Sequence, residues 1–287
     1  MDQVETTEAV RGHYDRIGGQ ECSRLTHDVA GRVSLEVHRR FLRRFVRPGS
    51  RVLEIGAGPG RFTLELAALD CRLVVTDLSA VQLDLNAAQL AGTAAETRVE
   101  RRELLDVCDT SRYDDHEFDA VVAFGGPLSY TFEQVDDSLR GLLRIVAPDG
   151  AVVASVMSLL GTWRHSLPAV IALAQTVGED ANDAVLRTGD LRHVVSEGDG
   201  HVCQMFRHAD VAAIVDRAGG LLLDSSASNW ASLSDAEALA TLEADPDRWG
   251  RFLDHEIAAC AQPGARDGGT HILFAARPTE VGRVRGR

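Results

Sequence analysis

A glycine-rich turn at residues 56–60 separates an apolar run from a helical pattern, in the segment VLEIGAGPG from Val52 to Gly60. Glycine permits positive φ angles and lets a ligand approach the backbone closely. The amino end of the following helix would present free N–H groups to an anionic group. Asp77 lies seventeen residues after Gly60, at the end of the next apolar run. A carboxylate at that place can hold both hydroxyls of a ribose.

The spacing of the glycines separates two classes of ligand. A dinucleotide fingerprint is G-x-G-x-x-G, and its third glycine would fall at Arg61. The chain has G-x-G-x-G instead, and the acid Glu54 stands two residues before Gly56. The spacing therefore disfavours a nicotinamide dinucleotide. A glycine-rich turn that binds no ligand stays an alternative.

The composition excludes several other chemistries. The 287 residues include 43 acidic and 30 basic side chains, for a net charge of -13, and every basic residue is an arginine. Without lysine there is no P-loop lysine, pyridoxal Schiff base or lysine general base. The acidic balance argues against nucleic acid or a membrane as the main partner. The 5 cysteines form no C-x-x-C pair, so we expect free thiols in a reducing, cytoplasmic compartment and no metal.

Strands and helices that alternate along the chain must position these residues. The patterns predict strands at 51–55, 72–76, 97–101, 118–124, 150–156, 221–225 and 270–276, and helices at 32–46, 61–69, 79–91, 132–146 and 208–218. Two more helical stretches are expected inside 234–261, and Pro148 to Gly150 is expected to form a turn before the fifth strand. This rhythm is typical of a parallel α/β sheet.

Two segments break the rhythm and are expected to cover the crevice at the carboxyl ends of the strands. We predict a helical N-terminal cap at 1–48, a core formed by 49–157 and 202–279, and a lid insertion at 158–201. Within the insertion only 167–177 has an amphipathic pattern, and a polar run follows it.

Five motifs in order resemble the class I S-adenosylmethionine-dependent methyltransferases. They are VLEIGAGPG, VVTDLS (74–79), LLDVCD (104–109), FDAVVAFGG (118–126) and LLRIVAPDGAVVASV (142–156). The resemblance is strong over about 51–157 and looser over 206–276. It implies a doubly wound, Rossmann-like, seven-stranded and mostly parallel sheet with a reversed last strand. It also implies S-adenosyl-L-methionine as the cofactor.

The resemblance assigns cofactor contacts along the strand tips. They are Gly56, Ala57, Gly58 and Gly60 around the methionine part, with Glu54 bracing the turn; Asp77 at the ribose; Leu78 and Val107 against the adenine; Asp106 at the adenine amino group; and Phe124 and Gly125 facing the methionine and the acceptor. Asp109 is a rival for the place of Asp106. The pair Tyr14-Asp15 resembles a Y-D pair near the start of many small-molecule enzymes of this kind, whose tyrosine closes over the cofactor. Arg24 is a candidate for the cofactor carboxylate.

The expected methyl acceptor is a small molecule. Enzymes that methylate amino groups of nucleic acids carry Asn or Asp followed by Pro-Pro and an aromatic residue, whereas this chain has Gly125-Gly126-Pro127-Leu128. No Pro-Cys pair supplies a nucleophile for cytosine, and the acidic pair Asp136-Asp137 is expected on an exposed helix face. O, N, S and C acceptors all stay open, with secondary or antibiotic metabolism as a plausible setting. An NAD-dependent oxidoreductase and a non-catalytic cofactor-binding protein are the alternatives, and the chain is expected to be a monomer or homodimer.

A general base is needed only where the acceptor holds a proton on its nucleophilic atom. Chain position favours His201, which follows Gly198-Asp199-Gly200 and precedes the helix at 208–218. An imidazole can take a proton at neutral pH. Tyr130 is a candidate for orienting the acceptor. The other histidines considered are His27, His165 and His193.

Overall fold

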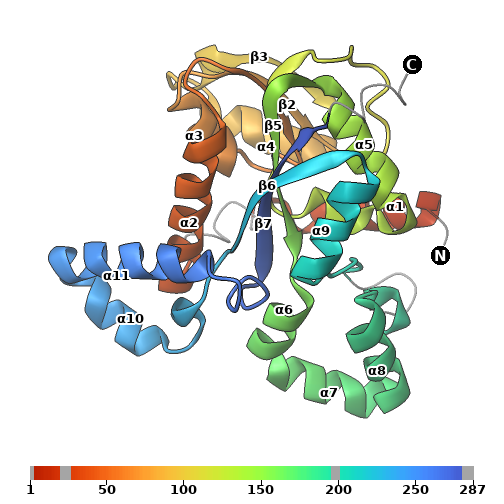
Figure 1. The fold of residues 1–287 in the computed structure, drawn as a ribbon, viewed down its shortest axis with the longest axis vertical. Helices are drawn as coiled ribbons and strands as arrows, with labels where there is room; N and C mark the ends of the chain where they lie inside the picture. The colour runs from red at the N-terminus through yellow and green to blue at the C-terminus, as the bar shows by residue number, and fades with distance from the viewer. Residues whose placement is uncertain (1–2, 20–26, 195–200, 280–287) are drawn as a thin grey trace.

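A seven-stranded sheet forms the centre of the computed structural model, which describes residues 3–19, 27–194 and 201–279 (Figure 1). The strand order is β3-β2-β1-β4-β5-β7-β6. The strands are β1 (Arg51–Ile55), β2 (Arg72–Asp77), β3 (Val99–Leu104), β4 (Phe118–Ala123), β5 (Val146–Met157), β6 (Gly220–Ala227) and β7 (His271–Pro278). The first five pair in parallel, whereas β7 runs antiparallel to both of its neighbours. The doubly wound sheet with a reversed last strand is thereby confirmed.

Helices cover both faces of the sheet, because successive strand residues point to opposite sides. Val52 packs with α2 (Val29–Phe45), α3 (Arg61–Ala67) and α4 (Ala80–Leu90). Leu53 packs instead with the group that includes α5 (Val135–Ile145) and α9 (His208–Arg217). Figure 1 shows α2 and α3 on one side of the sheet and α5 and α9 on the other. The central strand β1 is therefore buried on both faces, as expected for a parallel strand between two layers of helices.

Helix α2 belongs to the sheet face, although it lies inside the segment predicted as a cap. Its buried stripe includes Val33, Val37 and Phe41, and the Asp28 side chain caps its amino end by accepting a 2.7 Å hydrogen bond from the Gly31 amide. Within 1–48, the described helix that lies over the strand tips is α1 (Gln3–Ile17).

Strand β5 starts earlier than the sequence predicted. It begins at Val146, and the expected turn from Pro148 to Gly150 lies within its bounds as a bulge. Phe118 pairs with Val146 and Ala120 pairs with Ala151, so the residues between them loop outward. A Cβ on Gly150 would lie 2.2 Å from the Asp119 carbonyl oxygen, so only glycine fits there.

Two helical insertions interrupt the sequence of strands. The first contains α6 (Leu159–His165), α7 (Leu167–Val177) and α8 (Glu179–Thr188), and α8 replaces part of the run that the sequence showed only as polar. The second, between β6 and β7, contains α10 (Ala236–Glu243) and α11 (Pro246–Cys260), which project beside α2 in Figure 1. Short 3-10 turns complete the described chain: η2 (Glu96–Arg98), η3 (Pro127–Tyr130), η4 (Phe132–Gln134), η5 (Leu191–His193) and η6 (Ala231–Leu233). Over the residues described, no helix is both long and apolar enough to cross a membrane.

Candidate active site

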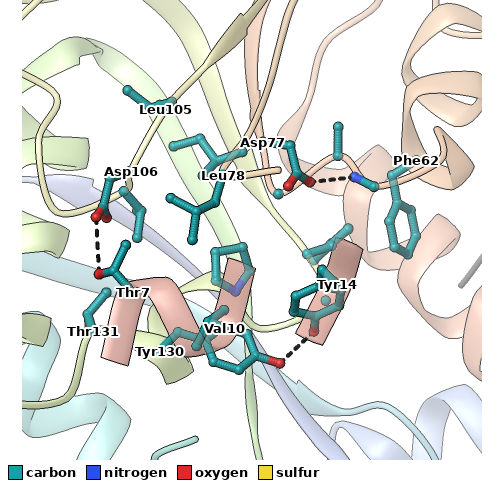
Figure 2. A pocket seen from close by; sticks show the side chains of 18 of the residues that line it. Thr7, Val10, Tyr14, Phe62, Asp77, Leu78, Leu105, Asp106, Tyr130 and Thr131 are labelled. Atoms are coloured by element: carbon teal, nitrogen blue, oxygen red, sulfur yellow. Dashed lines mark hydrogen bonds between the residues drawn. The ribbon is translucent and has the colours of Figure 1, made fainter. Parts of the chain in front are cut away.

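A cavity with about 1010 Å³ of open space lies at the carboxyl ends of the central strands, beneath α1 (Figure 2). This is the edge where parallel α/β sheets bind ligands. Most of the residues predicted to contact a cofactor line it. They are Tyr14, Gly56, Ala57, Gly58, Asp77, Leu78, Asp106, Val107, Phe124 and Gly125, and Tyr130 lines it as well.

The glycine turn that follows β1 forms one wall. Gly56 has a φ of 65° and Gly58 a φ of 51°, in the left-handed region that favours glycine. A Cβ on Gly56 would lie 2.7 Å from Cγ of Pro127, so the turn also needs glycine for space. The Gly58 amide donates a 2.9 Å hydrogen bond to Oδ2 of Asp77. This bond joins the tip of β1 to the tip of β2.

Asp77 is the last residue of β2 and is buried. Its second carboxyl oxygen accepts a 2.9 Å hydrogen bond from the Ser79 amide. Burial raises the pKa of Asp77, against the amides of Ser79 and Gly58, which act to lower it. A carboxylate offers about four acceptor positions, so two amide bonds leave capacity for hydroxyl donors in the cavity.

Asp106 occupies the corresponding place beyond β3. Its Oδ1 accepts a 2.9 Å hydrogen bond from the Cys108 amide, and its Oδ2 lies 3.4 Å from Oγ1 of Thr7, the bond drawn in Figure 2. Asp109 is exposed and does not line the cavity, so of the two rivals only Asp106 reaches it. Leu78 and Val107 add apolar surface on the same side.

Two predicted contact residues lie behind the cavity wall. Glu54 is 2% exposed, and its Oε2 has no hydrogen-bond partner; burial raises the pKa of this carboxyl to about 8. Gly60 caps α3 with a φ of 102°, and a Cβ there would lie 3.0 Å from Nδ2 of Asn86. Gly60 therefore permits α3 and α4 to pack closely, and neither residue lines the cavity.

Helix α1 covers the cavity with Tyr14, which was predicted as a contact, and with Thr7 and Val10, which were not. Thr7, Val10 and Tyr14 line it from one face of the helix. The helix is held by a hydrogen bond between Asp15 and Ser79 and by one of 2.8 Å from Nε2 of Gln82 to the Tyr14 carbonyl oxygen. The 7-10-14 spacing is a helical period and was the available signal.

Arg61 and Phe62, at the start of α3, also line the cavity without having been predicted as contacts. Arg24, the expected partner of a carboxylate, lies outside the described residues. Within the described part of the wall, Arg61 is the only cationic side chain.

Hydrogen bonds join Tyr14, Tyr130 and His201 in a line from the cavity to its rim. The Tyr14 and Tyr130 hydroxyl oxygens lie 2.6 Å apart, and the Tyr130 hydroxyl lies 2.7 Å from Nε2 of His201. Figure 2 shows the two tyrosines meeting below the cavity. His165 was also considered as a base, but it is exposed at the end of α6 and does not line the cavity.

The described part of the 158–201 insertion contributes less than expected. No residue of α6, α7 or α8 lines the cavity. The insertion is linked to the cavity wall by the hydrogen bond between His201 and Tyr130. His27 and His193 are exposed. Among the residues that the structure describes, no group of three His, Cys, Asp or Glu side chains could hold a metal ion.

Residues 52–150 match the family model described as a methyltransferase domain. Over these residues the chain has the sequence pattern of a methyltransferase domain. The sequence matches no curated protein.

Solved structures with the same fold extend beyond the matched segment. A chain of the complex between the Haloferax volcanii Trm112 methyltransferase activator and the putative methyltransferase is 19% identical, with a TM-score of 0.59 over 94% of this chain and 98% of that one. The 1,6-didemethyltoxoflavin-N1-methyltransferase of Burkholderia thailandensis is 17% identical, with a TM-score of 0.55 over 98% and 92%. A possible histamine N-methyltransferase of Thermotoga maritima is 12% identical, with a TM-score of 0.55 over 93% and 98%. The methyltransferase fold thus spans nearly the whole chain.

The wall of the cavity fits S-adenosylmethionine, the cofactor expected from the sequence motifs. Asp77 and Asp106 offer acceptors suited to ribose hydroxyls and to an adenine amino group. Leu78 and Val107 offer apolar surface suited to a purine ring. The Arg61 guanidinium suits a carboxylate.

Proposed function

We propose that the chain transfers the methyl group of S-adenosylmethionine to a small-molecule acceptor. The observation that carries this proposal is the junction of the glycine turn with Asp77, where the Gly58 amide and the Asp77 carboxylate join the tips of β1 and β2 inside the cavity. Asp77 would bind the ribose hydroxyls, Asp106 the adenine amino group, and Arg61 the carboxylate of the methionine part. Gly56 and Gly58 leave space beside that part of the molecule.

A small acceptor is supported by the covered position of the cavity and by the similar structures. Helix α1 lies over the strand tips and lines the cavity with Thr7, Val10 and Tyr14. The Burkholderia thailandensis enzyme binds 1,6-didemethyltoxoflavin, and the Thermotoga maritima protein is described as a possible methyltransferase of histamine. Both of these acceptors are small molecules. Secondary metabolism is the setting that we propose for this chain.

The bound cofactor supplies a methyl carbon activated by a sulfonium sulfur. The contribution of the chain is to align the acceptor with that carbon and to exclude water. Correct alignment of two reactants can lower a barrier by about 7–11 kcal/mol. Phe124 and Gly125, beyond the tip of β4, and Tyr130 line the part of the cavity where we place the acceptor.

Isothermal titration with S-adenosylmethionine, S-adenosylhomocysteine and NAD tests the proposal. We expect the two sulfur compounds to bind and NAD not to bind, and the reverse result would contradict the proposal. The product of a successful acceptor would be heavier by one methylene unit in mass spectrometry.

Asp77→Ala should weaken the binding of S-adenosylhomocysteine without unfolding the chain. Hydrogen bonds to a charged group are worth about 1.5–3 kcal/mol each, and a ribose offers two hydroxyls. Asp109→Ala is the matched control, because Asp109 is exposed outside the cavity. Gly58→Val should weaken binding further, since its φ of 51° and its place in the wall exclude a branched side chain. Unchanged affinity in both Asp77→Ala and Gly58→Val would refute the assignment of the cavity.

A further inference from the structure

Three side chains from three separate segments form one hydrogen-bonded chain at the cavity. Tyr14 comes from α1, Tyr130 from the end of η3, and His201 from the segment that leads to α9. We propose that His201, acting through Tyr130, receives the proton of a hydroxyl-bearing acceptor, and that the Tyr14 and Tyr130 hydroxyls bind that acceptor. This inference rests on the proposed methyl transfer and specifies the acceptor class as an alcohol or phenol.

The donors and acceptors of these three side chains set the direction in which a proton can move along their hydrogen bonds. A neutral imidazole accepts at one ring nitrogen, so Nε2 of His201 can accept from the Tyr130 hydroxyl at 2.7 Å. The Tyr130 oxygen can then accept as well as donate. In that arrangement it would accept from the Tyr14 hydroxyl at 2.6 Å, and both tyrosines line the cavity that an acceptor hydroxyl would enter.

The proposed step conserves atoms and electrons. The acceptor oxygen forms a bond to the methyl carbon, and the bond between carbon and sulfur breaks with its electron pair left on sulfur. The acceptor proton moves to the Tyr130 oxygen while the Tyr130 hydroxyl proton moves to Nε2 of His201. The products are the methyl ether, S-adenosylhomocysteine and an imidazolium at His201. His201 is partly exposed, so this proton can pass to solvent.

The three segments are held in register around this chain. Val10, Phe132 and Val202 form a small buried cluster, against which Tyr14 and Tyr130 pack. Since Val202 follows His201 directly, its burial fixes the backbone next to the imidazole.

Further bonds tie the same segments together. The backbone N–H of Gln204 donates a 2.7 Å hydrogen bond to the carbonyl oxygen of Ser129, the residue before Tyr130. The His13 ring lies 4.8 Å from the His201 ring, centroid to centroid, on the α1 side. Helix α1, η3 and the segment at 201–204 therefore meet at one place on the cavity.

Classes of methyl acceptor differ in whether they have a proton to give to these hydrogen-bonded side chains. Alcohols and phenols keep their proton near neutral pH and need a base to react, whereas a thiolate or a neutral amine carries a free electron pair already. A histidine reached through a tyrosine hydroxyl is therefore of use to an acceptor that holds a proton on its nucleophilic atom, as a hydroxyl does near neutral pH.

A phenol whose anion absorbs visible light provides a direct test without turnover. The full chain is saturated with S-adenosylhomocysteine, and 4-nitrophenol is added at about pH 7, close to its own pKa and above the ordinary pKa of a histidine, so that the imidazole can accept the proton. We expect binding to convert it to the phenolate, seen as the absorbance of the anion. His201→Gln and Tyr130→Phe should each abolish the rise of the bound phenolate fraction above that of 4-nitrophenol free in solution.

Matched variants separate this signal from general damage. His255→Gln makes the same change at an exposed position on α11, and Tyr113→Phe removes a hydroxyl that bonds to Glu103 away from the cavity. Both should form the phenolate as the wild type does. Titration of S-adenosylhomocysteine into the His201 and Tyr130 variants should give affinities within about threefold of the wild type, since both substitutions keep the cofactor wall intact.

Each other outcome has one meaning. Equal phenolate formation in all variants would overturn the role of His201 and Tyr130, and no binding of 4-nitrophenol to the wild type would overturn the acceptor class. Failure of the wild type to bind S-adenosylhomocysteine would refute the proposed methyl transfer itself. If His201→Gln is unfolded by circular dichroism, Tyr130→Phe decides the matter, because it retains the ring that packs beside Val202.

Discussion

Glu54 is a carboxyl group buried beneath the glycine turn, 2% exposed. Burial raises its pKa to about 8, which outweighs the hydrogen bond from Thr63 that acts to lower it. The group is therefore neutral in the folded chain at neutral pH. Its neutrality explains how an oxygen atom without a hydrogen-bond partner is tolerated in the core, since an ionised carboxylate there would be far more costly.

This pKa predicts how stability changes with pH. The folded carboxyl holds its proton more tightly than the unfolded one, whose ordinary pKa is 4.5. The resulting stability is fully present below that value and is lost as the pH rises to about 8, at about 1.4 kcal/mol for each unit of pKa difference. Glu54→Gln keeps the shape and should flatten the fall between these pH values. Urea unfolding at a series of pH values measures it, and parallel curves for the variant and wild type would show that Glu54 does not contribute.

Arg61 should recognise only the amino-acid part of the cofactor. Arg61→Gln is expected to weaken the binding of S-adenosylhomocysteine by roughly tenfold, the loss of one charge-assisted bond. Binding of 5′-methylthioadenosine, which lacks the carboxylate, should not change. Arg72→Gln, on the exposed start of β2, serves as the control. Equal weakening of both ligands would place Arg61 in a structural role instead.

Residues at the strand tips could be predicted from the sequence, whereas Thr7 and Val10 on α1 and Arg61 on α3 were not. Asp77 and Asp106 each follow a local apolar run, and the order of the motifs places both at the same edge of the sheet. Thr7 and Val10 reach the cavity only because α1 folds back over the strand tips, which no local pattern specifies. Gly60 lies in a different environment from the one its pattern predicted. Its glycine pattern suggested a ligand contact, but the space is needed by Asn86.

At the scale of elements, α1 connects two ends of the cavity. Thr7 meets Asp106 at one end, and Gln82 bonds to the Tyr14 carbonyl oxygen at the other. These bonds come from Gln82 on α4 and Asp106 beyond β3, and among the described residues of α1 only Thr6 and Val10 are buried. The helix is thus held mainly by polar contacts that water can replace, which is typical of segments that open locally.

Amide hydrogen exchange should show this opening. Exchange in Gln3–Ile17 is expected to slow when S-adenosylhomocysteine is added, because Thr7, Val10 and Tyr14 line its cavity. Helices α7 and α8 should change less, since no residue of either lines the cavity. Helices α10 and α11 provide an internal reference. Equal exchange in α1 with and without ligand would contradict a role for α1 as a mobile cover.

The insertions show why some elements were harder to predict than the sheet. Strands with strong apolar patterns were placed to within a few residues. Helix α8 lies in a polar run, and its buried residue is Val185. Its hydrophobic pattern was therefore faint. The early start of β5 follows from the bulge opposite Asp119, which is a tertiary feature.

Across the whole molecule, Glu256 anchors the projecting pair α10 and α11 to the core. Its buried carboxylate accepts hydrogen bonds from the Trp230, Ala231 and Ser232 amides at 2.7, 3.0 and 3.1 Å, and from the Ser232 hydroxyl at 2.7 Å. Ion pairs from Arg32 to Glu243 and from Arg40 to Asp254 join the pair to α2. This unit stands apart from the cavity, so its stability and cofactor binding should be separable.

Glu256→Gln tests that separation. The new amide nitrogen must face a backbone N–H, so a buried hydrogen bond is lost, at a cost of roughly 1.5–3 kcal/mol. We expect a lower Tm by calorimetry and unchanged affinity for S-adenosylhomocysteine. Glu237→Gln, exposed on α10, should alter neither. A Tm equal to that of the wild type would show that the carboxylate does not hold the helices in place.

The position of α1 also constrains the kinetics. The helix covers the cavity and, through Tyr14, supplies part of the wall proposed for the acceptor. The cofactor must bind before α1 closes over the cavity. The wall proposed for the acceptor is complete only after α1 has closed. Binding should therefore be ordered, with the cofactor first and S-adenosylhomocysteine released last. Under that order the spent cofactor inhibits competitively against S-adenosylmethionine but not against the acceptor, and reopening of a single N-terminal helix limits the turnover rate.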